Sequence, residues 1–381
     1  MKRVQWLNRL LAVIRREFVE ITRDKLYVAL AIISPFFLYF LFAYGFPLDV
    51  KNIPMGVLDM DRTRASTDYT RLFSNSNTFD LKYHYTSKEE MYHSLDLGKV
   101  RSALFIPPGF GRHLAKEENA EVQMLVDGSF PNNAVIIGGY VDAVSEVYNY
   151  KQLISYFKKK GYKSLPVGEI QLYSNAWFNP TLRSEDYMLP AVIALVLIFF
   201  PPLLSTVSIS REKESGAILS IYCSPITRTE YIIGKLVPYT AVTYLDAVIF
   251  LMITRYVFKV PMRGELGVIL LLLFLYSISV IAIGLFVASI VKRQVVAILI
   301  TAVGTLLPSF LYSGFMVPLQ SMGPDTQCIG RSLPITYAID GLRKLMLKGG
   351  GIEDIFIHLL IMTIAFLLLI AFTIFFFKKR L

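Results

Sequence analysis

Cysteine and histidine are scarce in this chain of 381 residues, which has two cysteines and four histidines. Cys223 and Cys328 fall on opposite sides of the membrane in the topology derived below, so they cannot form a disulfide with each other. Neither cysteine stands at a spacing typical of a zinc site. The sequence therefore predicts no disulfide framework, no metal and no other cofactor.

Nucleotide-binding and hydrolase motifs are also absent. A phosphate-binding loop needs GxxxxGK[ST], but Gly98-Lys99 and Gly234-Lys235 each precede an apolar residue and have no glycine-rich turn before them. The motifs HExxH and GxSxG do not occur. These absences argue against ATP hydrolysis by this chain and against an enzyme of any kind.

Apolar residues make up 54% of the chain and occur in long runs. Crossing a hydrocarbon core of roughly 30 Å takes ~20 helical residues. Helices are favoured in lipid because they satisfy every backbone polar group internally. We therefore predict an all-α membrane bundle of six transmembrane helices. The six runs are Leu26–Leu48, Tyr187–Ser210, Leu236–Thr254, Leu266–Val291, Gln294–Pro324 and Ile355–Phe377.

Lysine and arginine are distributed unevenly in this topology. With the N-terminus inside, the cytoplasmic segments hold 16 Lys and Arg, whereas the short outer loops hold 6. The positive-inside rule therefore places both termini in the cytoplasm. Much of the net charge of +10 is explained by the cytoplasmic membrane edges, so no nucleic-acid partner is predicted.

Residues 1–25 are predicted to form an amphipathic helix in the cytoplasmic membrane interface, ahead of the first span at 26–48. Its apolar face is expected to lie among lipid headgroups. Two roles remain open, an elbow that positions the first span or a simple anchor. The apolar side holds Leu7, Leu10, Leu11, Ile14, Phe18 and Ile21, and the charged side holds Arg9, Arg16, Glu17, Glu20 and Arg23.

Residues 49–186 form the one soluble-looking block and are predicted to be an inserted extracytoplasmic α/β domain. Alternation of strand-like and helical patterns indicates this fold. The strand-like runs are 53–58, 81–85, 102–106 and 122–126, and the helical patterns lie near 62–74, 87–97 and 108–117. A long helix follows, with an apolar stripe from Ile137 to Ile154, and Trp177-Phe178-Asn179-Pro180 is typical of an aromatic belt. Residues 187–381 hold the other five spans.

A short polar stretch, residues 211–235, joins the second and third spans and is predicted to form a compact cytoplasmic loop. It contains a helix-forming segment with an apolar stripe that the loop alone cannot bury: Ile218, Leu219, Ile221 and Tyr222. Such a stripe either docks on a soluble partner or packs on the membrane surface or on the chain's own helix ends. Thr227 and Glu230 are predicted to form a capping box that starts the next span after Ser224-Pro225.

Asp246 is the one acidic residue deep inside a predicted span. Burying a carboxylate in lipid is costly, so it should face a watery path or find a partner. It is a candidate for the translocation path. The alternative is a structural hydrogen bond to Tyr239, Thr243, Tyr244 or another span.

The long outer connection, residues 320–351, is helix-like over Tyr337–Leu347. A re-entrant or interfacial helix fits this pattern, and a plain outer loop is the alternative.

Together these segments resemble the permeases of the ABC type-2 transporter family, in particular exporter-like members with a large outer domain after the first span. The matching features follow the family's order along nearly the whole chain. They are the amphipathic N-terminal helix, Trp177–Pro180, Arg211–Gly216, Ser224–Glu230, Gly234–Tyr239, and Ser313-Gly314-Phe315 followed by Pro318 and Ser321-Met322.

The resemblance implies a permease subunit that dimerises, with itself or with a related permease, and binds a separate ABC ATPase at its cytoplasmic side. The segment 211–222 is similar to the family's coupling helix. The resemblance thus implies ATPase coupling by Glu212, Glu214, Gly216, Ile218, Leu219, Ile221 and Tyr222. Family members often carry Thr after the glycine and an acid two residues later, whereas this chain has Ala217 and Leu219, which predicts a more apolar contact.

The predicted function is export of small amphipathic molecules or drugs across the inner membrane. By resemblance, a periplasmic adaptor and an outer-membrane channel are further partners, and membrane lipids surround the spans. The alternative is a non-transporting multi-span component of a secretion system or a phage-receptor-like protein.

Overall fold

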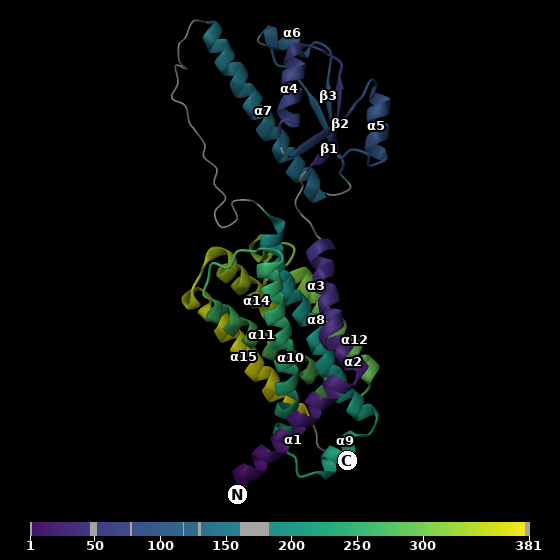
Figure 1. Ribbon diagram of the computed structural model, residues 1–381, viewed down its shortest axis with the longest axis vertical. Helices are drawn as coiled ribbons and strands as arrows, with labels where there is room; N and C mark the ends of the chain where they lie inside the picture. Colours follow the sequence, from purple (N-terminus) through teal and green to yellow (C-terminus); the bar gives the residue numbers. More distant parts are fainter. Residues whose placement is uncertain are drawn as a thin grey trace. The chain divides into compact units, whose positions relative to one another are not determined.

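The computed structural model describes residues 2–45, 52–76, 78–116, 118–128, 131–160 and 183–377. They fall into two compact units, one within Met1–Pro47 and Ala176–Leu381 and the other within Leu48–Asn175 (Figure 1). We call the first the helical unit and the second the sheet unit. The predicted aromatic belt, residues 177–180, lies outside the described residues.

Among the described residues, six helices are long and apolar enough to cross a membrane, which confirms the six predicted spans. The first span combines α2 (Lys25–Val28), η1 (Ala29–Ile33) and α3 (Ser34–Gly45), and α1 (Lys2–Arg23) precedes it. The others are α8 (Ser184–Glu214), α10 (Arg228–Tyr256), α11 (Leu266–Ile290), α12 (Gln294–Tyr312) and α15 (Ile352–Phe376).

Two helix ends differ from the prediction. α8 continues past Ser210 to Glu214, because the charged residues at its end find partners on neighbouring helices. α12 ends at Tyr312 rather than near Pro324. Gly314 has a φ of 83°, and a residue in this left-handed conformation ends a helix.

α8 is the core helix of the helical unit. In its apolar 18-residue stretch 89% of the residues are buried, against 22% for the first span and 17% for α15. Gly284 of α11 permits close approach, because an added Cβ would lie 2.1 Å from the Pro202 carbonyl oxygen. Thr206 of α8 bonds with the Gly284 carbonyl at 3.1 Å and with the Thr301 hydroxyl of α12 at 2.9 Å. Small residues and hydroxyls thus hold the bundle together, as is usual for helices packed in lipid.

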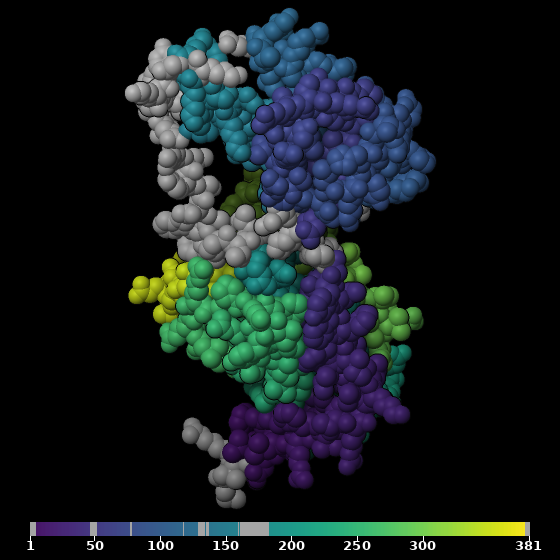
Figure 2. Space-filling model, turned by 45° about the horizontal axis from the view of Figure 1, so that its top comes forward, coloured from purple at the N-terminus to yellow at the C-terminus, as the bar shows by residue number. Residues whose placement is uncertain are grey.

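The first span is more peripheral, and α1 with this span forms a continuous strip on the surface of the helical unit (purple, Figure 2). The connection between α12 and α15 is a series of short helices: η2 (Leu319–Ser321), α13 (Pro324–Ser332), α14 (Pro334–Arg343) and η3 (Lys344–Lys348). α14 packs on α8 and α11 with Ile335, Ile339 and Leu342 buried. The helix-like pattern predicted for this connection is therefore confirmed as helix.

The sheet unit contains a four-stranded sheet in the order β2-β1-β3-β4. β1 (Ile53–Asp59) lies parallel to β2 (Phe79–His84) and to β3 (Ser102–Ile106), and β4 (Gln123–Val126) lies antiparallel to β3. All four predicted strands are confirmed. The helices are α4 (Arg64–Ser74), α5 (Lys88–Asp96), α6 (Phe110–Ala115) and α7 (Pro131–Lys159).

Two apolar clusters flank this sheet. Tyr69, Phe73, Phe110 and Tyr148 from α4, α6 and α7 belong to the larger cluster, and Met91 of α5 belongs to the smaller one. Such covering of both faces is usual for a largely parallel sheet.

Candidate functional site

The last four residues of α8, Arg211 to Glu214, are all charged, and each contacts a different part of the helical unit. Arg211 pairs with Asp24, which caps α2. Lys213 donates to the carbonyl oxygens of Ala288 and Ser289, at 2.5 and 2.8 Å, where α11 ends. A cation at this position offsets the unpaired carbonyls and the negative end of the helix dipole.

Glu214 makes the complementary contact at the start of α12. Its Oε2 accepts a hydrogen bond from the backbone N–H of Gln294 at 3.0 Å. Glu212 faces inward and is only 4% exposed. The end of α8 is therefore a junction between α2, α11, α12 and the interior of the unit.

A buried ion cluster surrounds Glu212. Its Oε1 lies 2.8 Å from Arg16 of α1 and 3.3 Å from the Nζ of Lys235 of α10, and its Oε2 accepts from the Tyr231 hydroxyl at 2.5 Å. Lys235 is fully buried and also bonds Glu17 of α1 at 2.8 Å. Desolvated charges of this kind persist only when they are paired and hydrogen-bonded.

This cluster corrects the prediction that Glu17 lies on a charged outer side of α1. Glu17 is fully buried because Lys235 and the Tyr239 hydroxyl, at 3.0 Å, satisfy its carboxylate. Leu10, Val13 and Ile21 are buried on the same helix, whereas Leu7, Leu11 and Phe18 are exposed. α1 thus packs a mixed apolar and ionic face on α10.

Three carboxylates meet in the cluster, since oxygens of Glu17, Glu20 and Glu212 lie within 4.8 Å of one another. Burial and the neighbouring Glu17 raise the pKa of Glu20. Burial would lower the pKa of Arg16, but Glu212, Glu17 and Glu20 outweigh it and raise that pKa. The Lys235 ammonium already supplies a cation to this group of carboxylates.

A break at Ser215-Gly216-Ala217 separates α8 from α9 (Ile218–Cys223). Gly216 has a φ of 75°, in the left-handed region that favours glycine. The predicted coupling segment 211–222 is therefore two helices, the end of α8 and the short α9. The sequence pattern missed the break because the spacing of apolar residues does not show which backbone conformation Gly216 adopts.

α9 buries most of the predicted apolar stripe within the chain itself. Ile218 and Ile221 are 5% and 7% exposed and pack in a cluster with Tyr231, and Tyr222 packs against that cluster. Leu219 differs, with 49% of its surface exposed. Packing on the chain's own helix ends therefore accounts for three of the four stripe residues, and Leu219 remains on the surface.

The return from α9 to α10 is held by local hydrogen bonds. The predicted capping box is confirmed, because Glu230 donates its N–H to Thr227 Oγ1 at 3.2 Å while its carboxylate accepts from the Thr227 N–H at 2.6 Å. The same carboxylate pairs with Arg9 of α1 at 2.8 Å. α1 is therefore bonded to both helices that flank α9.

Asp246 lies on α10 and is 3% exposed. Two of the hydroxyls considered for it bond elsewhere, Tyr239 with Glu17 and Thr243 with the Tyr239 carbonyl. Among the described residues no hydrogen bond or ion pair involves its carboxylate. Asp246 therefore takes no part in the ion cluster around Glu212.

Sequence reasoning placed Glu212 on a docking surface, whereas the structure buries it, and it did not find Glu17, Lys235 or Tyr231. Two weak signals were present in the sequence. Lys235 directly precedes an apolar run, and Glu17 interrupts the apolar positions along one face of α1. Neither pattern identifies the partner, since the residues are 218 positions apart.

A protein-family model described as "ABC-2 family transporter protein" matches residues 26–375. The chain belongs to this family. Its relatives include the probable multidrug ABC transporter permease YbhS of Escherichia coli, 26% identical over 90% of this chain and 89% of the relative. YbhR, of the same description and organism, is 26% identical over 91% of this chain and 92% of the relative.

A eukaryotic relative is ABC transporter G family member 20 of Dictyostelium discoideum, 24% identical over 96% of this chain and 49% of that protein. The family and the six apolar helices establish a multi-pass membrane permease of the ABC class. They do not favour the secretion-component or phage-receptor alternative. Membership of the family implies pairing with an ABC ATPase, and it groups the chain with transporters rather than enzymes.

Proposed function

We propose that this chain is the membrane permease subunit of an ABC exporter that moves small amphipathic molecules or drugs outward across the inner membrane. A separate ABC ATPase subunit supplies the energy and docks at α9. The relatives described as multidrug permeases support the substrate class. The single observation that carries the docking site is the exposed Leu219 on a helix whose other stripe residues are anchored inside the chain.

Coupling in this proposal runs from α9 through the end of α8. In this scheme, movement of α9 is passed to Gly216 and then to the four charged residues that contact α1, α2, α10, α11 and α12. Within this scheme Leu219 is the contact residue. Ile218, Ile221 and Tyr222 anchor α9, Gly216 is the joint, and Glu212 and Glu214 transmit its movement.

The topology belongs to the same proposal. The excess of Lys and Arg at the end that bears α1 and α9 supports a cytoplasmic location of that end and of both termini. The sheet unit would then lie outside the membrane on the opposite side, where a periplasmic adaptor and an outer-membrane channel are the proposed partners. The permease is proposed to work as a dimer, with itself or a related permease, and α13 and α14 form the re-entrant segment.

The test of docking is co-purification of the full chain with its ATPase. Leu219→Asp is expected to lower recovery of the complex about tenfold or more, because a charge would enter an apolar contact. Leu97→Asp is the matched control, since Leu97 is 55% exposed on the sheet unit. Docking at α9 is wrong if Leu219→Asp retains both the complex and its stimulated ATPase activity.

Asp246 is proposed to line the translocation path and to attract cationic substrates. Its burial and its lack of a bonding partner among the described residues support this role. Asp246→Asn is expected to reduce transport of cationic substrates while neutral substrates are unaffected. Equal transport of every cationic compound by the variant and the wild type would remove Asp246 from the path.

A further inference from the structure

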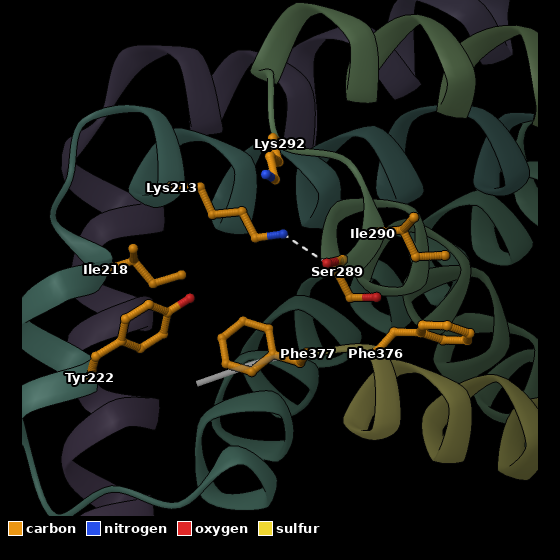
Figure 3. A pocket seen from close by; sticks show the side chains of 8 residues that line it. All are labelled: Lys213, Ile218, Tyr222, Ser289, Ile290, Lys292, Phe376 and Phe377. Carbon is orange, nitrogen blue, oxygen red and sulfur yellow. Dashed lines mark hydrogen bonds between the residues drawn. The ribbon is translucent and has the colours of Figure 1, made fainter. Parts of the chain in front are cut away.

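A cavity of about 490 Å³ lies beside α9, between the ends of α8, α11 and α15 (Figure 3). Ile218 and Tyr222 of α9 line one side with their inward faces. The cavity is distinct from the ion cluster, because no residue of that cluster lines it. Neither the proposed docking contact nor the proposed translocation path uses it.

One half of the cavity is cationic. Lys213 and Lys292 both line it and are close enough to repel each other. The Lys213 ammonium donates to three carbonyl oxygens at the end of α11, those of Ala288, Ser289 and Val291, so it offers an occupant its charge rather than a hydrogen bond. The Lys292 side chain is exposed. Among the described residues, no acidic side chain lines the cavity. Two neighbouring cations without a carboxylate favour an anionic occupant.

Polar contacts in the cavity extend beyond the lysines. The Tyr222 hydroxyl points into the space between α9 and the lysines (Figure 3). Glu214, the acid next to Lys213, bonds with the Gln294 backbone instead of closing the cavity. In the sequence Phe377 is followed by Lys378, Lys379 and Arg380, so the chain's own continuation is cationic and is a poor electrostatic match for this site.

The other half of the cavity is apolar and continues onto the outside of the bundle. Ile290, Phe376 and Phe377 form its wall. Phe372 and Phe375, on the outer surface of the same helix α15, are 50% and 74% exposed. The cavity therefore joins a cationic polar pocket to an apolar surface at the end of two membrane-spanning helices, which is the depth of lipid headgroups.

We propose that this cavity binds an anionic phospholipid, with its phosphate headgroup bonded by Lys292 and Tyr222 in the positive field of Lys213 and its acyl chains along α15. Basic pockets between spans at a membrane edge are known sites for anionic headgroups. A free phosphate would use the cationic half alone, whereas a phospholipid fills both halves. The binding is a property of this chain and does not depend on an ATPase partner.

The experiment is native mass spectrometry of the purified full chain with phosphatidylglycerol or phosphatidylcholine of matched acyl chains. Lys292→Gln is expected to lower phosphatidylglycerol affinity about fivefold and to leave phosphatidylcholine unchanged, since each basic residue near an anionic lipid contributes a factor of this order. Arg293→Gln is the matched control, because Arg293 is exposed beside the cavity but does not line it.

A second pair of variants tests the apolar half. Phe376→Ala is expected to weaken phosphatidylglycerol binding, while Phe37→Ala, at a 69% exposed position on α3, is not. Inorganic phosphate and the tail-free headgroup are expected to compete poorly. Equal losses for Lys292→Gln and Arg293→Gln would overturn the site, and full competition by inorganic phosphate would overturn its assignment to a lipid. Thermal unfolding of each variant checks that the fold is retained.

Discussion

The helices α1 and α14 lie toward opposite ends of the helical unit (Figure 1). Lys235 of α10, which pairs with α1, and Arg343 of α14 are held by different kinds of acceptor. Lys235 is held by the carboxylates of Glu17 and Glu212. Arg343 donates instead to backbone carbonyls of Tyr187, Gly314 and Phe315, at 3.2, 2.8 and 3.2 Å. Its guanidinium also lies 3.6 Å from the Tyr187 ring centroid.

The difference shows what each cation depends on for its partners. Glu17 and Glu212 belong to α1 and α8, and Glu212 also pairs with Arg16, so the ion cluster joins side chains from three helices. Carbonyl acceptors are fixed by the backbone, and a forked guanidinium needs all of them in place. The contacts of Lys235 therefore depend on side chains of two other helices, whereas those of Arg343 form a rigid clamp on backbone groups.

The largest expected effect is that of Lys235→Met. It leaves Glu17 and Glu212 buried without their shared cation, which should cost about 3–5 kcal/mol of unfolding free energy. Thermal or denaturant unfolding in detergent measures this. Lys25→Met, at an exposed position of α2, should be close to neutral. Adding Glu17→Gln to Lys235→Met should restore part of the loss, and absence of any loss would show that the cluster does not stabilise the fold.

Arg343→Lys should have the next largest effect. Lysine keeps the charge but cannot reach three carbonyls with one planar fork, so a loss of about 1.5–3 kcal/mol is expected. Arg255→Lys is the control, because Arg255 is exposed on α10. The same unfolding measurement applies. A rigid clamp is contradicted if both substitutions cost the same.

Gly216→Ala is expected to cost about 1–2 kcal/mol, because alanine is strained at a φ of 75° while no atom lies within 4 Å of the added Cβ. Gly128→Ala is the matched change at a glycine with equal space and no positive φ. If Gly216 is the joint of the coupling segment, Gly216→Ala should lower ATP-driven transport by a larger factor than it lowers the amount of folded protein. Transport that falls only in proportion to the amount of folded protein would make Gly216 a structural residue only.

The smallest effect is a pH dependence at the clamp end. Burial would raise the pKa of Asp340, but hydrogen bonds from His358, at 2.7 Å, and Lys344, at 2.9 Å, lower it to about 2. A carboxyl group has a pKa near 4 in the unfolded chain, and one whose pKa is lower in the folded state stabilises the fold at pH values above about 4. This contribution disappears as the pH falls toward about 2. Solvent screening keeps it small because the side chain is 48% exposed. Asp340→Asn should remove this pH dependence of the unfolding free energy, so that the variant is slightly less stable than the wild type near pH 7 and the difference shrinks as the pH falls toward about 2.

Much of the fold was predictable because each span and strand has a local signature. Long apolar runs predicted the six helices, and short apolar runs such as Ser102–Ile106 predicted the strands. The capping box of Thr227 and Glu230 was predictable for the same reason, since its two residues are three positions apart. The end of α12 was not, because it depends on the conformation of one glycine, Gly314.

The candidate site was predictable in place but not in detail. The position of α9 between two spans follows from the alternation of apolar and polar segments. The burial of Glu212 does not, because it requires Arg16 and Lys235 to meet it from helices far apart in the chain. An amphipathic pattern shows which residues are apolar and leaves open what covers them, so Ile218 and Leu219 look alike in the sequence and differ in exposure, 5% against 49%.

The sequence by itself determined a membrane bundle of six helices with an inserted sheet, because hydrophobic length and periodicity are local properties. It also determined the family, through motifs spread along nearly the whole chain. Only the tertiary structure decided that the charges at the end of α8 face inward and that Leu219 alone of its stripe stays outside. The reason is that a buried ion pair depends on two distant helices bringing opposite charges within about 3 Å, and no local pattern specifies that distance.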